Sequence, residues 1–504
     1  MDILQNLLVG LSHLFGVIPF FLLLAGIFTG VIAGALPGIS FVNAMALALP
    51  FTYVMQPINA MIFLSGLYCG GVFGGSISSI LINIPGSPGS LPATWDGYPM
   101  TRRGESARAL GIAITCSAIG GVGSALMMIF VSPPFANFAL RFGQPEFFAA
   151  TILGLVSVVA IAKGNMLTSL ISLFVGLTVG AIGLDPLYAI PRLTFGWTVL
   201  DNGVSFVVVL IGMFAIGEVL GWISSRKSVS YKPASATKAR LPGIKELLKL
   251  KGAIARGTGI GCVIGAIPGT GAIIGAIIAY GVEKHVSPHG DRFGTGVDEG
   301  LAAPETAKNA TTGTATIPLL TLGIPGSAAT AIMLAALMLH GVNPGPMLFI
   351  TGTDLVYTVF AAYLVANILM IAVGMLVARA FTLLMTIPPA ILFGFITILC
   401  LVGAFGVRNN IADVYICIGF GILGFLLQKF NVPTAPLILG VILGPLAERY
   451  FLTSMIAYDN DFLIFFTRPL SGLIMFLAFA FLIWSFWAPI KTLITRLRII
   501  FSVG

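Results

Sequence analysis

Four Pro-Gly pairs interrupt apolar stretches of this sequence, and uncharged polar side chains flank each of them. Proline lacks a backbone N–H and clashes with the preceding helical turn, whereas glycine tolerates positive φ, so together they end a helix. The N-terminus of the next helix offers N–H groups to an anion, and unwound carbonyl groups suit a sodium ion. The breaks and their polar neighbours are therefore the candidate substrate- or ion-binding residues: Pro37, Gly38, Ser40, Asn43, Ser76, Ser79, Pro85, Gly86, Ser87, Pro268, Gly269, Thr270, Glu305, Asn309, Thr312, Pro325, Gly326 and Ser327.

A plainer reading of these breaks stays open. A Pro-Gly pair can be a simple kink, and Ser or Thr hydroxyls can bond back to carbonyl groups of their own helix. The duplication of the whole set favours the binding interpretation.

Glu305 and Lys308 stand one helical turn apart, directly before the Thr-rich stretch 309–316. Two readings are open: they pair with each other, or they bind a substrate or a cation. Other charged residues at possible membrane depth lie near the ends of apolar runs, where long side chains reach the interface: Lys163, Asp185, Glu218 and Arg408.

The sequence contains no pattern that predicts catalysis or a bound cofactor. His285 and His289 have a spacing that can bind metal on a helix, but Pro288 and Gly290 favour a solvated loop. The five cysteines lie in apolar stretches without a CxxC pair, and GxxxxGK[ST], HExxH and GxSxG do not occur. We therefore expect no enzyme, and no metal site beyond one for a transported sodium ion.

The composition is that of a membrane protein. Of 504 residues, 57% are hydrophobic and 9% are charged, compared with about 25% charged in soluble domains. Mean hydropathy is +1.03. These values exclude a soluble enzyme, a disordered chain and a nucleic-acid-binding protein. The length leaves room for about a dozen helices of about 20 residues, and 61 glycines favour close helix packing and broken helices.

Apolar runs mark the candidate spans, at 14–36, 58–82, 106–132, 146–162, 166–187, 203–223, 252–281, 304–322, 350–378, 388–407, 412–428, 432–447 and 468–488. Two further apolar pieces, 41–55 and 325–340, are too short to cross a bilayer alone and predict half-helices or re-entrant hairpins.

Basic residues gather in the stretch 224–251, in the loop 102–108 and in the C-terminal tail. The positive-inside rule places all three in the cytoplasm, and the net charge of +8 fits that rule. No Lys or Arg precedes Arg102, so the N-terminus is expected outside.

The two sides of the basic linker resemble each other. Glycines four residues apart lead into GALPG at 34–38 and into GAIPG at 265–269, which is 231 positions later. The IPGS motifs at 84–87 and 324–327 are 240 positions apart, which predicts a nine-residue length change in the loop 283–300. Two long matches in the same order indicate an internal repeat.

The charges favour an inverted repeat, because the basic loop 102–108 has its counterpart in 340–350, which contains no Lys or Arg. The predicted fold is an all-α polytopic membrane protein with about a dozen transmembrane helices in two inverted repeats, with Pro-Gly-broken helices and re-entrant hairpins. The predicted domains are an N-terminal membrane repeat, a basic cytoplasmic linker, a C-terminal membrane repeat, and an additional helix with a cytoplasmic tail, at 1–223, 224–251, 252–450 and 451–504.

The chain resembles the large membrane subunit of tripartite tricarboxylate transporters, the TctA family, over residues 15–450. The segments that carry the resemblance are GALPGIS at 34–40, GGVFGGSISSILINIPGSPGS at 70–90, WDGYPM at 95–100, EGLAAPETAKNA at 299–310 and LGIPGS at 322–327.

The resemblance implies a secondary active transporter subunit of the bacterial inner membrane, which takes up citrate-like tricarboxylates or related organic acids by cation symport. It implies sodium or a proton as the coupling cation. It also implies two protein partners: a small TctB-like membrane subunit of about four spans and a TctC-like periplasmic solute-binding protein. Two other classes stay open: a channel or stand-alone carboxylate facilitator without a binding-protein partner, and a membrane scaffold without transport of its own.

The charge distribution predicts a sidedness that labelling can check. We expect Ser228→Cys to react with an impermeant thiol reagent only after the membrane has been opened, because the linker is expected in the cytoplasm. The native chain serves as the control, because it shows how far the five native cysteines react with the reagent. Labelling of Ser228→Cys from the periplasm of intact cells would overturn this assignment.

Overall fold

The structure is a computed structural model that describes residues 3–36, 40–161, 166–185, 188–225, 239–269, 271–384 and 389–483. Several predictions fall outside the described residues: the site residues Pro37, Gly38 and Thr270, the charged residue Lys163, residues 226–238 of the linker 224–251, and the cytoplasmic tail from residue 484.

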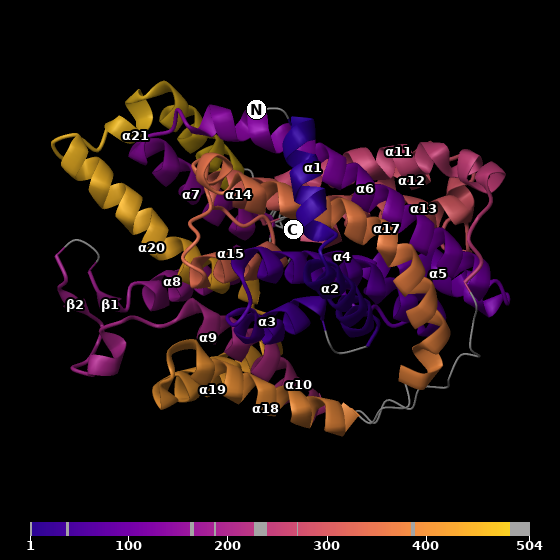
Figure 1. The fold of residues 1–504 in the computed structure, drawn as a ribbon, viewed down its shortest axis with the longest axis horizontal. Coiled ribbons are helices and arrows are strands. Elements are labelled where there is room, and N and C mark those ends of the chain that lie inside the picture. Colours follow the sequence, from indigo (N-terminus) through magenta and orange to yellow (C-terminus); the bar gives the residue numbers. More distant parts are fainter. Residues whose placement is uncertain are drawn as a thin grey trace, which may run out of the picture. The chain divides into compact units, whose positions relative to one another are not determined.

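Contacts divide the chain into two units. The larger unit consists of Met1–Leu140 and Val207–Phe425. Its helices (Figure 1), with α9 and α19 crossing its boundary, are α1 (Ile3–Leu14), α2 (Val17–Ala35), α3 (Phe41–Thr52), α4 (Pro57–Ile82), η1 (Pro88–Ser90), α5 (Leu91–Arg102), α6 (Ser106–Ala139), α9 (Phe206–Leu210), η3 (Ile211–Ile216, a π-helix), α10 (Gly217–Ser225), α11 (Ile244–Ala266), α12 (Gly271–Val286), η4 (Gly290–Arg292), α13 (Asp298–Thr314), α14 (Thr316–Leu322), α15 (Ala328–Leu339), α16 (Leu348–Thr351), α17 (Thr353–Leu384), α18 (Pro389–Arg408) and α19 (Ile411–Lys429).

The smaller unit consists of Arg141–Phe206 and Leu426–Gly504. Its elements are α7 (Gln144–Ile161), α8 (Met166–Gly180), β1 (Gly183–Leu184), β2 (Pro191–Arg192), η2 (Thr198–Leu200), α20 (Thr434–Ala457), α21 (Ile464–Thr467) and a further helix, Pro469–Ile483. The two strands pair antiparallel, with Gly183 opposite Arg192.

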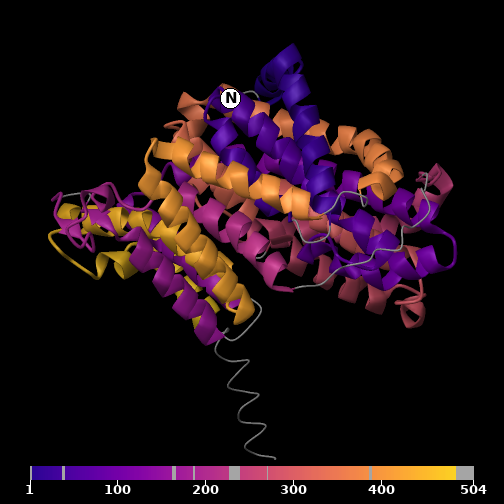
Figure 2. The ribbon, with the colours of Figure 1, turned by 90° about the horizontal axis from the view of Figure 1, so that it is seen from below.

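Glycines on α2 allow this helix to lie directly against α4. Both helices belong to the indigo-to-purple part of the ribbon (Figure 1, Figure 2). A Cβ atom at any of these glycines would collide with a carbonyl oxygen of α4, so the two backbones are in contact. The three close approaches are Gly26 on Phe63, Gly30 on Leu67 and Gly34 on Gly71.

The same arrangement recurs between α11 and α13. The close approaches there are Gly257 on Ala303, Gly261 on Ala307 and Gly265 on Thr311. The glycines are 231 positions after those of α2, and their partners are 240 positions after those on α4. The internal repeat read from the sequence is therefore also a repeat of tertiary contacts.

The breaks at the IPGS motifs begin in the same way in both repeats. Asn83, which ends α4, has φ 59°, and Gly323, which ends α14, has φ 73°. These two residues are again 240 positions apart. The left-handed backbone at each position stops the helix one residue before Ile-Pro-Gly-Ser.

The nine-residue difference between the repeats lies mostly in one connection. Residues 53–56 join α3 to α4, whereas residues 287–297 join α12 to α13. This segment falls within the predicted loop 283–300.

The prediction of an all-α polytopic membrane protein is confirmed. In the described residues, eight helices have the length and composition of membrane spans, and six apolar helices are shorter. The two predicted half-helices correspond to α3 and α15, of 12 residues each. The structure corrects the predicted span 252–281, which consists of α11 and α12, because the break at Pro268–Gly269 separates them.

Gly261 and Gly259 provide a matched test of the close packing of α11. A Cβ at Gly261 would lie 2.6 Å from the Cβ of Ala310, whereas nothing lies within 4 Å of one at Gly259. We expect Gly261→Ala to destabilise the folded protein by about 1–3 kcal/mol, and Gly259→Ala to be neutral or stabilising by up to about 1 kcal/mol. Thermal unfolding in detergent measures both. Equal stability of the two variants would contradict the packing described here.

Candidate functional site

The polar helix α13 lies in the interior of the larger unit. Every residue from Gly300 to Thr314 is buried, although the segment carries Glu305, Lys308 and Asn309. Burying such side chains costs free energy unless they are paired and hydrogen-bonded. The helices packed on α13, which include α4, α6, α11 and α12, must therefore supply partners as well as packing.

Glu305 and Lys308 form a buried ion pair, with Nζ 3.1 Å from Oε1. Their exposed fractions are 1% and 0%. Ser76 of α4 donates to Oε1 of Glu305 (2.6 Å), and Ser117 of α6 donates to Oε2 (2.9 Å). The structure thus shows Glu305 and Lys308 paired with each other, and helices α4, α6 and α13 contribute to this pair.

Lys308 also reaches the Pro-Gly break that follows α4. Its Nζ donates to Ser90 (3.0 Å) and to Ser76. Ser90 ends η1, and its hydroxyl lies 3.0 Å from the hydroxyl of Ser87. Gly75 approaches these two hydroxyls so closely that a Cβ there would lie 2.6 Å from either oxygen. The break is therefore joined directly to the buried ion pair.

An equivalent contact runs from the first repeat to the break of the second repeat. Tyr68 of α4 stands 240 positions before Lys308, and its hydroxyl lies 3.3 Å from Ser327 at the second IPGS break. Ser327 is 3.2 Å from Thr330, just as Ser87 is close to Ser90. Each repeat therefore reaches the break of the other, through an ammonium group in one case and a phenol in the other.

Asn309 extends the cluster on the side of Glu305. Its Nδ2 donates to Ser117 (2.7 Å) and to the carbonyl of Glu305 (3.0 Å). Its Oδ1 is buried and has no hydrogen-bond partner among the described residues. The bond to a carbonyl group fixes which amide atom is nitrogen, because a carbonyl can only accept. The result is a buried acceptor one helical turn after Glu305.

The structure brings some of the predicted site residues together. Ser76, Ser87, Glu305 and Asn309 belong to one hydrogen-bonded cluster with Lys308. Thr312 lies on the next turn of α13, where its hydroxyl donates to the carbonyl of Asn309 (2.7 Å).

Other predicted residues have local partners. Ser40 caps α3 by accepting from the N–H of Val42 (3.3 Å), and Ser79 donates to the carbonyl of Gly75 in its own helix (2.8 Å). Asn43 lines a small pocket with residues of η3, α10 and α18. The contact of Ser79 is the one that the plainer reading describes.

Backbone contacts hold the Pro-Gly pairs. Gly269, which follows Pro268, has φ 84°, and its N–H donates to the carbonyl of Gly326, after Pro325 (2.9 Å). Gly86, after Pro85, donates to the carbonyl of Gly75 (3.3 Å). The two breaks of the second repeat are therefore bonded to each other.

Sequence reasoning missed three members of this region: Ser90, Ser117 and Asn367. Asn367 of α17 donates to the carbonyl of Tyr363 (2.8 Å), and its buried Oδ1 also has no partner in the part of the chain that is described. Polar side chains inside long apolar runs are the signal that could have identified Ser117 and Asn367. Ser90 stood in the repeated Pro-Gly-Ser string after the first break.

Asp96 of α5 is a further buried carboxylate to which the sequence assigned no role. Its Oδ1 accepts from the backbone N–H groups of Gly294 (2.9 Å), Gly296 (2.8 Å) and Val297 (2.9 Å). Its Oδ2 accepts from the hydroxyl of Tyr280 (2.9 Å). Asp96 therefore ties the first repeat to the segment that leads into α13.

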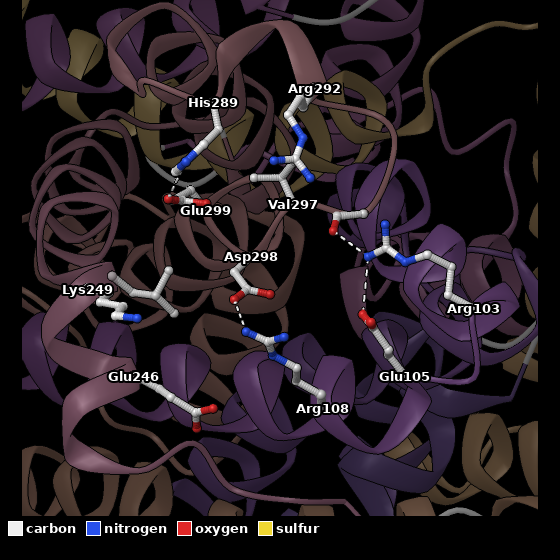
Figure 3. A pocket seen from close by; sticks show the side chains of 12 residues that line it. Arg103, Glu105, Arg108, Glu246, Lys249, His289, Arg292, Val297, Asp298 and Glu299 are labelled. Carbon is white, nitrogen blue, oxygen red and sulfur yellow. Dashed lines mark hydrogen bonds and ion pairs between the residues drawn. The ribbon is translucent and has the colours of Figure 1, made fainter.

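A pocket of about 560 Å³ lies beside this segment (Figure 3). Three of its four acids pair with other lining residues: Asp298 with Arg108 (2.6 Å), Glu105 with Arg103 (3.2 Å) and Glu299 with His289 (3.0 Å). Burial raises the pKa of Asp298, and Arg108 acts in the opposite direction. The lining residues are Arg103, Glu105, Arg108, Glu246, Lys249, Leu250, His289, Arg292, Gly296, Val297, Asp298 and Glu299. The Arg108–Asp298 pair joins the start of α6 to the start of α13.

The sequence of this chain matches a known family and two known proteins. The model of the tripartite tricarboxylate transporter TctA family matches residues 20–439. The chain is 34% identical over 482 residues to an uncharacterised 52.8 kDa protein in the TAR-I ttuC' 3' region of Agrobacterium vitis, with 94% of each chain covered. It is 36% identical over 212 residues to an uncharacterised protein in the TAR-II ttuC' 3' region of the same organism, covering 42% of this chain and 88% of that one. No solved structure matches.

The buried pair predicts a pattern of stabilities. We expect Glu305→Gln and Lys308→Met each to destabilise the protein by about 3–5 kcal/mol, because each leaves an uncompensated buried charge. We expect the double variant to recover most of that loss, since it leaves no charge. Thermal unfolding in detergent at one pH measures all three. Additive losses in the double variant would contradict the pairing.

Proposed function

This chain belongs to the tripartite tricarboxylate transporter TctA family, and from that premise we propose that it is the subunit that carries citrate-like tricarboxylates or related organic acids across the membrane by cation symport. It is a transporter component and a multi-pass membrane protein. The proposal adds the direction, the substrate class and the coupling to a cation.

The observation that carries the proposal is the buried pair Glu305–Lys308 beside the Pro-Gly break at residues 85–86, which is called the first break from here on. Ionisable residues are costly in a membrane protein and mark substrate or ion pathways when they lie inside it. Lys308 offers an ammonium group to a carboxylate, and the hydroxyls of Ser87 and Ser90 are donors beside it. The site also lies where the two repeats meet, which is where secondary transporters bind their substrates.

The proposed partners follow from the tripartite system. A small TctB-like membrane subunit completes the membrane part, and a TctC-like periplasmic protein delivers the carboxylate. The proposed location is the inner membrane of a bacterium, with the loop 102–108 and the linker 224–251 in the cytoplasm.

Uptake measurements test this function. With both partner proteins present, we expect accumulation of labelled citrate or a related organic acid to require the binding protein and an inward sodium or proton gradient. We expect Glu305→Gln to abolish concentrative uptake per inserted molecule, because the buried cation site or pair is lost. Uptake that proceeds downhill without the binding protein would instead support a facilitator, and no uptake of any carboxylate would contradict transport.

Glu283→Gln is the matched control. Glu283 of α12 is also a buried carboxylate, paired with Arg256 of α11 (2.7 Å), but it lies outside the cluster of the first break. We expect it to lose stability without losing coupled uptake per folded molecule. Equal loss of uptake in both variants would show that any broken pair inactivates the carrier.

A further inference from the structure

The cluster at the first break is electrically balanced as it stands. Glu305 carries one negative charge and Lys308 one positive charge, and the hydroxyl and amide groups around them are neutral. A carboxylate that entered this buried site would leave one negative charge without a partner, which a low-dielectric interior disfavours. The site can therefore accept an anion only together with a cation.

We propose that Lys308 exchanges its counter-ion during transport: it turns from Glu305 to the carboxylate of the substrate at the Ser87–Ser90 break, and Glu305 then binds a monovalent cation. This inference rests on the proposed function and names the element that couples the two solutes. One cation enters for each carboxylate group that Lys308 holds.

The contacts of Lys308 support the anion half of this exchange. Nζ lies 3.0 Å from Ser90 and 3.1 Å from Glu305, so one ammonium group already touches both sites. An ammonium group has three donors and can move between partners without leaving the cluster. Beyond Ser90 begins α5, of 12 residues, whose N-terminal end favours negative charge.

The contacts of Glu305 support the cation half. Ser117 lies against both Glu305 and Asn309, so the carboxylate, the hydroxyl oxygen and the amide oxygen belong to one neighbourhood. Oδ1 of Asn309 is fully buried and has no donor among the described residues, and an unsatisfied buried acceptor is what a bound cation or water would explain.

The chemistry of these ligands favours a small hard cation. Carboxylate, hydroxyl and amide oxygens suit such ions. Among the residues that the structure describes, no three or more His, Cys, Asp or Glu gather as a metal site would require. A single carboxylate with neutral oxygens balances one positive charge, so sodium or lithium fits better than a divalent ion.

The other repeat cannot perform the same exchange. The positions equivalent to Glu305 and Lys308, 240 residues earlier, are Ser65 and Tyr68. Both are buried and uncharged in their ordinary forms, and Tyr68 contacts the second break at Ser327. Of these two equivalent contacts, only the one made by Lys308 is charged, so the proposed exchange takes place at the break beside Ser87 and Ser90.

A first experiment uses cations alone and the purified chain. We expect sodium chloride, compared with choline chloride at equal ionic strength, to raise the thermal midpoint of Lys308→Met, because its unpaired Glu305 binds the cation. The wild-type protein and Glu305→Gln/Lys308→Met should show no such rise. Lithium and potassium replace sodium in parallel samples, to rank the cations by radius.

Arg256→Met is the matched control for this experiment, because it leaves Glu283 as a different unpaired buried carboxylate. A sodium effect of the same size in Arg256→Met would show that any such carboxylate responds, and would overturn the proposal. So would the absence of any cation effect in folded Lys308→Met.

A second experiment measures citrate binding, and it decides the question if Lys308→Met does not fold. In the wild-type protein, sodium should strengthen citrate binding by about 5- to 150-fold, the usual range of coupling between two ligands. In Glu305→Gln, binding should persist and lose this dependence, because one carboxylate group of citrate then balances the charge of Lys308 without a cation. Citrate binding to Glu305→Gln that keeps the wild-type dependence on sodium would overturn the proposal.

These outcomes separate the exchange from the proposed function. One outcome is that the complete system takes up a carboxylate on a sodium gradient while citrate binding to Glu305→Gln still depends on sodium. That result would leave the proposed symport intact and would show that the cation binds elsewhere. A sodium effect confined to Lys308→Met, with no uptake of any carboxylate by the complete system, would leave a cation site in a protein that does not perform the proposed transport.

Discussion

The burial of the Glu305–Lys308 pair is the constraint on which the arrangement of the larger unit depends. Two opposite charges can stay away from water only if their remaining hydrogen-bonding capacity is filled. Ser76 of α4 and Ser117 of α6 supply donors to Glu305, and Ser90 accepts from Lys308. Helices α4, α6 and α13 must therefore come together. The chain after α4, which contains Pro85 and Gly86, must also place Ser90 within reach of the ammonium group of Lys308.

Close approach of backbones makes this burial possible. Gly257, Gly261 and Gly265 of α11 touch the backbone of α13, so polar α13 is covered without bulky side chains in between. The same geometry encloses α4 through α2. In a membrane, where lipid is as apolar as the protein interior, helices associate through such packing and through interhelical hydrogen bonds rather than through the hydrophobic effect.

The repeats share their backbone contacts and differ in their chemistry. The glycine rows, the left-handed residues before Ile-Pro-Gly-Ser, and the crossings to the opposite break all recur at fixed offsets. At the crossings, however, Lys308 corresponds to Tyr68, and Glu305 corresponds to Ser65. A duplicated scaffold has thus kept one charged site and one neutral site, and the asymmetry lies in the side chains.

The sequence by itself determined the class of protein, the repeat and the position of the Pro-Gly breaks, because apolar run length, glycine spacing and the limits on proline are local properties. It also predicted Glu305, Ser76, Ser87 and Asn309 as site residues, and it left open whether Glu305 and Lys308 pair. Only the tertiary structure joined them to Ser117 and Ser90, and gave Ser40, Asn43 and Ser79 other contacts. The physical reason is that a hydrogen bond between helices depends on which faces meet and at what height, and residues 188 or 218 positions apart carry no local signal of that meeting.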